Sequence, residues 1–217
     1  MRYIPYLVCL VLVGGAAFGP LGEAAAAGPA DLLVHAGMNV STVHLDDLIA
    51  KSRRGLALGV GTCLRLSDDF CLLPEVWYMQ KGIRGSVAWE LVTLETRYQT
   101  ISVPVLLALQ FPAARFESRA FIGPAIDWVL ANEIRRKELQ AWQAWHDVAD
   151  QAEDLYVSLI VGGGTRYGRL DLEVRYQHGL SKLSDYRYRE FLDVMPAMTT
   201  SKPAYDRTWT FSVGYWF

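Results

Sequence analysis

The sequence predicts an all-β fold, an eight-stranded antiparallel β-barrel that crosses a membrane. Eight segments alternate apolar and polar residues with a period of two, which is the period of a β-strand. The connections between them are alternately short and long, as in barrels with tight turns on one rim and loops on the other. After the N-terminal region no stretch has the ~18 apolar residues that a transmembrane helix needs. A membrane-spanning chain of this kind closes into a barrel, because lipid offers no partner to an open sheet edge.

The last segment, 207–217, shows the two faces most clearly. One face is large and partly aromatic, and the other is small and polar. A small membrane barrel turns the first face toward lipid and the second into its narrow lumen. The lipid-facing residues are Trp209, Phe211, Val213, Tyr215 and Phe217, and the lumen-facing residues are Thr208, Thr210, Ser212 and Gly214.

The other strands are expected at 31–43, 55–66, 70–82, 98–111, 119–130, 155–168 and 169–180, the first having the weakest pattern. Pro74, Pro104 and Pro124 interrupt three of them, and because proline cannot donate a ladder hydrogen bond we expect bulges or strand ends there. From the second strand on, the lipid-facing residues in chain order are Leu56, Leu58, Val60 and Leu64; Val76 and Tyr78; Ile101, Val103, Val105 and Leu107; Ile122, Ile126, Trp128 and Leu130; Leu155, Val157, Leu159 and Val161; and Leu170, Leu172, Val174 and Tyr176.

The long connections are expected at about 44–54, 83–95, 132–153 and 182–206. In outer-membrane barrels such loops are extracellular, and the short turns face the periplasm. The insert 132–154 differs from its surroundings, because its apolar residues follow helical spacing. It predicts a short amphipathic helix, in which Trp142 and Trp145 contact a partner or glycolipid, or pack on the barrel rim. The residues with that spacing are Ile134, Trp142, Trp145, Ala149 and Ala152.

Residues 1–27 are predicted to be a cleaved signal peptide, which leaves 28–217 as the barrel domain. Arg2 supplies the positive charge, an apolar segment follows, and the alanine run 24–27 fits a cleavage site. Export of a barrel predicts the outer membrane of a Gram-negative bacterium as its location.

Composition excludes two classes. A mean hydropathy of +0.13 is too polar for a bundle of membrane helices. The net charge of −2 provides no basic surface for nucleic acid. The seven Trp and eleven Tyr suit the aromatic girdles of a membrane barrel.

Six charged residues share the lumen-facing parity. Eight strands enclose an interior that side chains just fill, so these charges must be paired or hydrogen-bonded. We expect a salt-bridged plug, with a proton or ion path as the alternative. The six are Arg65, Glu75, Asp127, Asp171, Glu173 and Arg175.

Cys63 and Cys71 flank the first short turn with lumen-facing parity. The oxidising periplasm makes them a candidate disulfide, and two reduced thiols fit the pattern equally well. No group of His, Cys and carboxylate residues has the spacing of metal ligands, so no cofactor is expected.

Catalysis would need a nucleophile beside a base. His178 and Ser181 lie near the end of the seventh strand, and His146 lies in the insert. The spacing of His178 and Ser181 places them on opposite strand faces, which is poor geometry for a hydrogen bond. We therefore expect no enzyme, with a lipid hydrolase using His178 or His146 as the alternative.

The segments FCLLPEVWYMQKG, ISVPVLLALQF, FIGPAIDWVL and LEVRYQHGLSKL, in this order, resemble the PorT-like family of small outer-membrane β-barrels. The resemblance covers about residues 56–217 and implies an outer membrane protein beta-barrel domain of the OmpA/OmpX type. It further implies a structural or unassigned role; the family's namesake is associated with protein secretion. The insert between the fifth and sixth strands departs from the family pattern.

These observations favour a structural or surface-interaction protein, with a hydrolase, a narrow channel or a secretion-associated barrel as alternatives. The expected partners are outer-membrane lipids, barrel-assembly machinery and an unidentified surface or periplasmic protein. Similarity to outer-membrane proteins implies that Phe211, Val213, Tyr215 and Phe217 also form the signal that the assembly machinery recognises.

Overall fold

The structure, a computed structural model, describes residues 31–44, 50–87, 92–113, 115–138, 141–142, 146–147, 155–181 and 205–217. The predicted signal peptide lies outside these residues. Eight long strands and two short ones make up the described fold. They are β1 (Asp31–His44), β2 (Ala50–Arg65), β3 (Phe70–Val87), β4 (Val92–Pro112), β5 (Glu117–Glu138), β6 (Ala141–Trp142), β7 (His146–Asp147), β8 (Leu155–Tyr167), β9 (Leu170–Gly179) and β10 (Tyr205–Trp216).

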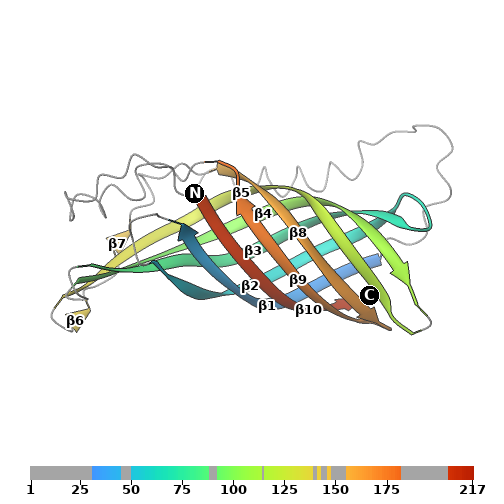
Figure 1. The fold of residues 1–217 in the computed structure, drawn as a ribbon, viewed down its shortest axis with the longest axis horizontal. Coiled ribbons are helices and arrows are strands. Elements are labelled where there is room, and N and C mark those ends of the chain that lie inside the picture. Colours follow the sequence, from blue (N-terminus) through green and yellow to red (C-terminus); the bar gives the residue numbers. More distant parts are fainter. Residues whose placement is uncertain are drawn as a thin grey trace. The chain divides into compact units, whose positions relative to one another are not determined.

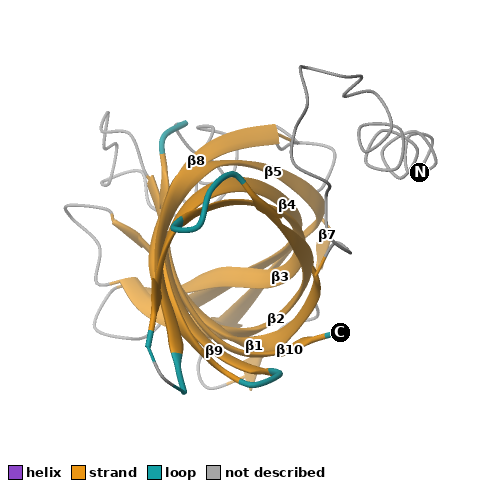
Figure 2. Ribbon diagram, turned by 90° about the vertical axis from the view of Figure 1, so that its right-hand side faces the viewer, coloured by secondary structure: helices purple, strands orange, loops and turns teal. Residues whose placement is uncertain are grey.

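The long strands close into one antiparallel barrel (Figures 1 and 2). Each pairs with its neighbour in the chain, and β1 completes the ring by pairing with β10 from Leu33 opposite Trp216 to His44 opposite Tyr205. Because the ring is closed, no long strand is left as a free edge within the barrel wall. The predicted eight-stranded antiparallel barrel is confirmed.

Tight turns occupy one rim, which we call the turn rim. They lie at residues 66–69, 113–116 and 168–169, between β2 and β3, β4 and β5, and β8 and β9. Gly168 has a φ of 60°, a left-handed conformation that glycine adopts without steric cost, and this lets two residues reverse the chain. The opposite rim, where β1 ends and β2 begins, is called the loop rim.

Alternation along each strand separates two surfaces. The outward side chains are apolar and open, for example Leu58 and Val60, each 43% exposed. The inward side chains that alternate with them, such as Ala57, are buried. A water-soluble protein rarely exposes so much contiguous apolar surface, whereas lipid covers such a surface in an outer-membrane barrel.

Strands β3, β4 and β5 continue past the barrel wall at the loop rim (Figure 1). The last pair between β5 and β8 is Trp128 with Leu155, yet β5 runs on to Glu138. We call the paired segments 83–87, 92–97 and 132–138 of these strands the sheet extension.

The helix predicted within 132–154 is wrong where the structure describes that segment. Residues up to Glu138 belong to β5, Trp142 pairs with Lys137, and His146 pairs with Ile134. Pairing to the adjacent β4 overrides the helical spacing, which rests partly on Trp145, Ala149 and Ala152 outside the described residues. The described residues contain no helix that is long and apolar enough to cross a membrane.

The three prolines lie inside their strands and not at bulges, and Pro74, the fifth residue of β3, is the one near a strand end. Pro74, Pro104 and Pro124 each coincide with a two-pair gap in the ladder toward the preceding strand. For instance, pairing of β3 with β4 skips from Pro74–Val105 to Trp77–Ser102 without any change of register. The barrel therefore accommodates each missing N–H by omitting ladder bonds; the expectation of bulges is wrong, and that of a position near a strand end is met by Pro74 alone.

Candidate functional site

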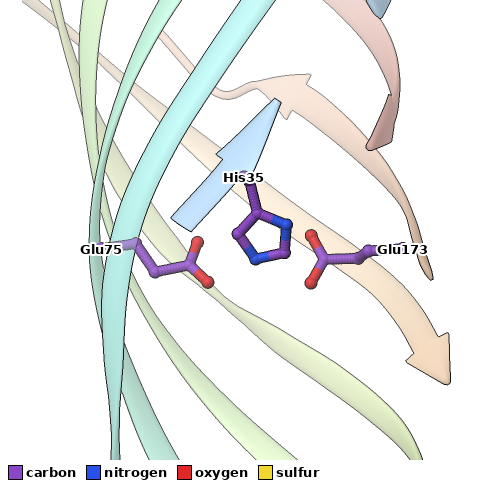
Figure 3. A group of neighbouring side chains, drawn as sticks. All are labelled: His35, Glu75 and Glu173. Carbon is purple, nitrogen blue, oxygen red and sulfur yellow. The ribbon is translucent and has the colours of Figure 1, made fainter. Parts of the chain in front are cut away.

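Three ionisable side chains from separate strands converge in the lumen. They are His35 of β1, Glu75 of β3 and Glu173 of β9, and Figure 3 shows the imidazole between the two carboxylates. One potential ligand atom of each lies within 4.8 Å of the others. All three are buried, with exposed fractions of 1%, 4% and 3%. An imidazole nitrogen and two carboxylate oxygens at this separation form a set that could hold a cation.

Two arginines bind the carboxylates of this site. Arg175 donates to Glu75 Oε2 at 2.8 Å and also pairs with Glu173. Arg119 donates to Glu173 Oε2 at 2.7 Å and forms a bidentate pair with Asp171 at 2.5 and 2.7 Å. Charged groups without water must be compensated in this way, so the cluster is held by charge-assisted hydrogen bonds. We call these five residues and His35 the lower cluster.

Glycines on the flanking strands make the convergence sterically feasible. His35 is paired with Gly59 on β2 and with Gly214 on β10. A Cβ at Gly59 would lie 2.4 Å from Cε2 of Trp77, and one at Gly214 would lie 2.9 Å from Cε1 of His35. The missing side chains leave room for the Trp77 ring and the His35 ring, whose centroids are 5.1 Å apart.

A second group of polar residues lies closer to the loop rim. Lys81 of β3 has no exposed surface, and its Nζ lies 3.0 Å from Asp206 Oδ2 and 3.9 Å from Asp127 Oδ1. Gln177 accepts from Lys81 at 3.0 Å and donates to Asp127 at 2.7 Å. These four residues, the upper cluster, tie β3, β5, β9 and β10 together across the lumen.

Apolar side chains fill the lumen beside the lower cluster, toward the turn rim. Leu33, Leu73, Leu106 and Ile160 come from four different strands and are each no more than 1% exposed. They belong to one buried group that also includes Trp216. The buried Arg119–Asp171 ion pair lies at the same end of the lumen, with the Arg119 guanidinium over the Trp216 ring.

The structure divides the lumen charges that the sequence treats as one set. Glu75, Asp171, Glu173 and Arg175 are in the lower cluster, and Asp127 is in the upper one. Arg65 differs, because it is the last residue of β2 and its side chain is exposed at the turn rim. Arg65 has the lumen-facing parity that the sequence predicts. Because it lies at the end of the strand, its side chain is at the rim and not in the filled part of the lumen.

The two cysteines are not joined by a disulfide in the structure. Arg65 is opposite Cys71 in the ladder, so Cys63 lies diagonally from Cys71 rather than directly opposite it. Gln110 of β4 donates to Cys71 Sγ at 3.5 Å and to Cys63 Sγ at 3.8 Å. Both thiols are buried beside the apolar group.

His178 and Ser181, the pair considered for catalysis, have different partners in the structure. His178 is on the outer face of β9, where its ring stacks with Tyr176 and Tyr205. The Ser181 hydroxyl accepts a 2.9 Å hydrogen bond from the Val157 N–H. Ser181 lies beyond β9, which ends at Gly179, so it has no strand face.

The residues expected to form the assembly signal occupy the outer face of β10. Exposed fractions are 47% for Phe211, 53% for Val213, 38% for Tyr215 and 69% for Phe217. Of the two tryptophans of the insert, the structure describes the backbone of Trp142 in β6, and Trp145 lies outside the described residues.

Sequence reasoning missed His35, Lys81, Arg119, Trp77 and Asp206 as lumen residues. Parity would have found three of them, because Trp77 and Lys81 are two and six residues from Glu75 on β3, and Arg119 is eight residues from Asp127 on β5. His35 lies in the strand with the weakest alternation, and Asp206 was expected in a loop. At neither position does the local sequence pattern identify the residue as facing the lumen.

Comparison with known proteins gives one family and several distant structures. The profile of the family described as outer membrane protein beta-barrel domain matches residues 27–185. No protein with a curated description matches the sequence.

Among solved structures, Ail of Yersinia pestis in complex with the heparin analogue sucrose octasulfate is 14% identical, with a TM-score of 0.43, covering 88% of this chain and all (100%) of Ail. Neisserial surface protein A (NspA) is 12% identical, with a TM-score of 0.45 and coverage of 88% and 100%. The outer membrane enzyme PagL is 9% identical, with a TM-score of 0.45 and coverage of 83% and 98%. Similarity this low transfers no activity from any of them.

Proposed function

Because the chain belongs to the outer membrane protein beta-barrel domain family, we propose that it acts in the outer membrane as a structural or surface-interaction protein with a closed polar interior. The observation that carries the proposal is the sheet extension. The β5 part of the extension, residues 132–138, follows the last pair of β5 with β8 and is seven residues long, which corresponds to about 23 Å of strand. A rigid projection of this length presents a surface beyond the barrel wall.

Charge pairing supports a rigid extension. Glu95 of β4 is 4% exposed and accepts from Arg53 of β2 and Arg84 of β3, both at 3.2 Å. Arg97 of β4 pairs with Glu133 of β5. Cross-strand pairs of opposite charge stabilise neighbouring strands, so the extension has its own supporting contacts.

Crosslinking in intact outer membranes tests this role. A variant that lacks 131–152 removes the β5 part of the sheet extension and joins Trp128 to Leu155, its last partner on β8, through four residues, and a matched control shortens the 182–204 connection. We expect the first variant to lose crosslinks to neighbouring surface molecules that the control retains. Identical crosslinks in both variants and the wild type would contradict a role for this part of the rim.

The interior supports a closed barrel over a channel. Buried apolar residues and the Arg119–Asp171 ion pair fill the lumen next to the turn rim, and the polar residues toward the loop rim are largely ion-paired. We expect no single-channel conductance in planar bilayers. Stable conductance steps that disappear when Leu106 is replaced by a larger residue would favour the channel instead.

The surface chemistry supports a non-enzymatic role over a lipid hydrolase. His178 packs between Tyr176 and Tyr205, and the Ser181 hydroxyl is occupied by a backbone N–H. Replacement of His178 by alanine is therefore expected to leave the acylation pattern of membrane lipids unchanged. A change in that pattern would favour the hydrolase.

We further propose PorT-like membership, export by the N-terminal signal peptide and recognition of the β10 outer face by the assembly machinery. The ordered motifs from 70 to 183 support the first. The apolar segment after Arg2 supports the second, and the row Phe211, Val213, Tyr215 and Phe217 supports the third. Mass spectrometry of the mature N-terminus tests the export step, with cleavage after residue 26 or 27 expected.

A further inference from the structure

We propose that His35, Glu75 and Glu173 bind a divalent transition-metal ion of the zinc type inside the barrel. The proposal goes beyond the surface role and does not depend on it. It starts from geometry, because three ligand atoms from β1, β3 and β9 lie within 4.8 Å of one another. Figure 3 shows both carboxylates turned toward the imidazole.

The imidazole has one nitrogen available for an ion. His35 Nδ1 shares a hydrogen bond with the Ser212 hydroxyl at 3.4 Å, which orients the ring. Nε2 is buried and has no hydrogen-bond partner among the described residues. A buried polar atom without a partner is costly, and metal-binding histidines commonly hold the second ring nitrogen in a hydrogen bond of this kind.

The charge of the lower cluster also calls for a cation. Three carboxylates (Glu75, Asp171 and Glu173) face two guanidinium groups (Arg119 and Arg175), which leaves one unbalanced negative charge when His35 is neutral. Burial of that charge away from water is unfavourable. A proton on His35 neutralises the cluster, a divalent ion changes its net charge from −1 to +1, and proton and ion compete for Nε2.

The carboxylates retain acceptor capacity beside the arginines. An ionised carboxylate has about four lone-pair sites. Glu75 Oε2 accepts from Trp77 Nε1 at 2.7 Å and from Arg175 at 2.8 Å, whereas Oε1 has a single long contact of 3.4 Å with Arg175. Oε1 is therefore the oxygen that an ion would bind first.

The donor set selects the class of ion. Calcium and magnesium prefer sites made entirely of oxygen, whereas an imidazole nitrogen with carboxylate oxygens suits zinc and its first-row neighbours. The apolar group at the turn rim closes one side, so an ion would enter from the loop rim. On that side the buried oxygen Oδ1 of Asn39 has no hydrogen-bond partner among the described residues.

Calorimetric titration of the chelator-treated, detergent-folded barrel with zinc chloride tests the site. We expect one zinc ion per chain in the wild type. Loss of an outer hydrogen-bond partner of a ligand typically weakens binding 10- to 100-fold, so Ser212→Ala should weaken it about tenfold. His35→Gln removes a ligand and should weaken it by about a hundredfold or more.

His178→Gln is the matched control, because it removes a histidine from the outer face. Wild-type affinity in His35→Gln, or equal losses in His35→Gln and His178→Gln, would overturn the proposal. Gel mobility with and without heating reports whether each variant folds. If His35→Gln does not fold, zinc X-ray absorption of the wild type decides: one imidazole with oxygen neighbours supports the site. Sulfur at about 2.3 Å would place the ion at Cys63 and Cys71 instead and overturn it.

Discussion

Lys81 Nζ lies 3.0 Å from Asp206 Oδ2, which joins β3 to β10 through the middle of the barrel. The two residues are 125 positions apart in the chain, and both are buried. Such a pair adds little to stability compared with apolar residues of the same size, yet loss of one partner leaves the other charge buried and unpaired.

Lys81→Met should therefore destabilise the folded barrel by about 3–5 kcal/mol, because Asp206 and Asp127 lose their shared cation. Urea unfolding in lipid vesicles, followed by tryptophan fluorescence, measures the change in free energy. The double variant Lys81→Met with Asp206→Asn should recover part of the loss. An unfolding midpoint for Lys81→Met equal to that of the wild type would exclude this pairing.

Gly59→Ala should cost about 1–3 kcal/mol of unfolding free energy, since the new methyl group lies 2.4 Å from the Trp77 ring and forces it to move. The same substitution in a Trp77→Leu background should cost clearly less, because the obstructing ring is absent. This double-mutant cycle isolates the contact between the two positions. Equal costs in both backgrounds would show that Trp77 does not occupy the space above Gly59.

Val60→Arg should destabilise the membrane-inserted barrel by about 2–4 kcal/mol, whereas Leu66→Arg should cost about 0–1 kcal/mol. Val60 faces outward in the apolar band of β2, and Leu66 lies in the turn that follows it. Equilibrium unfolding from lipid vesicles measures both. Similar costs at the two positions would contradict the placement of β2 across the hydrocarbon layer.

Cys63 and Cys71 should resist maleimide in the folded protein and react together after denaturation, without any reductant. Burial denies the reagent access to either sulfur, and in the chain cleaved after residue 27, which lacks Cys9, the two thiols add two labels once it unfolds. Intact-mass spectrometry counts the labels. A denatured barrel that takes up label at neither cysteine until it is reduced would indicate a disulfide.

Sequence patterning predicts the barrel well because a period of two assigns a whole strand face from a few residues. Once Leu172 and Val174 face lipid, Asp171, Glu173 and Arg175 must face the lumen. It does not predict which lumen residues meet, since that depends on strand tilt and stagger around the barrel. Glu75 and Arg175 are 100 residues apart and no local signal connects them.

The remaining misses have separate physical causes. Helical spacing in the insert was overridden near Ile134 because β4 offers backbone partners to β5. Arg65 has the right parity but lies where the strand ends. His35 belongs to a strand in which the apolar alternation is weak, so the histidine does not stand out as the odd member of a face.

The omitted ladder pairs beside Pro74, Pro104 and Pro124 lie in three consecutive seams, β2–β3, β3–β4 and β4–β5. The pairings of β8 with β9, β9 with β10 and β10 with β1 run without a gap. Resistance to shear along a seam grows with the number of bonds that must break together, so the wall is mechanically uneven. The longest unbroken block of β2–β3 is five pairs, against nine or more in each continuous seam, so this seam should separate first when the barrel is pulled from a membrane by one end.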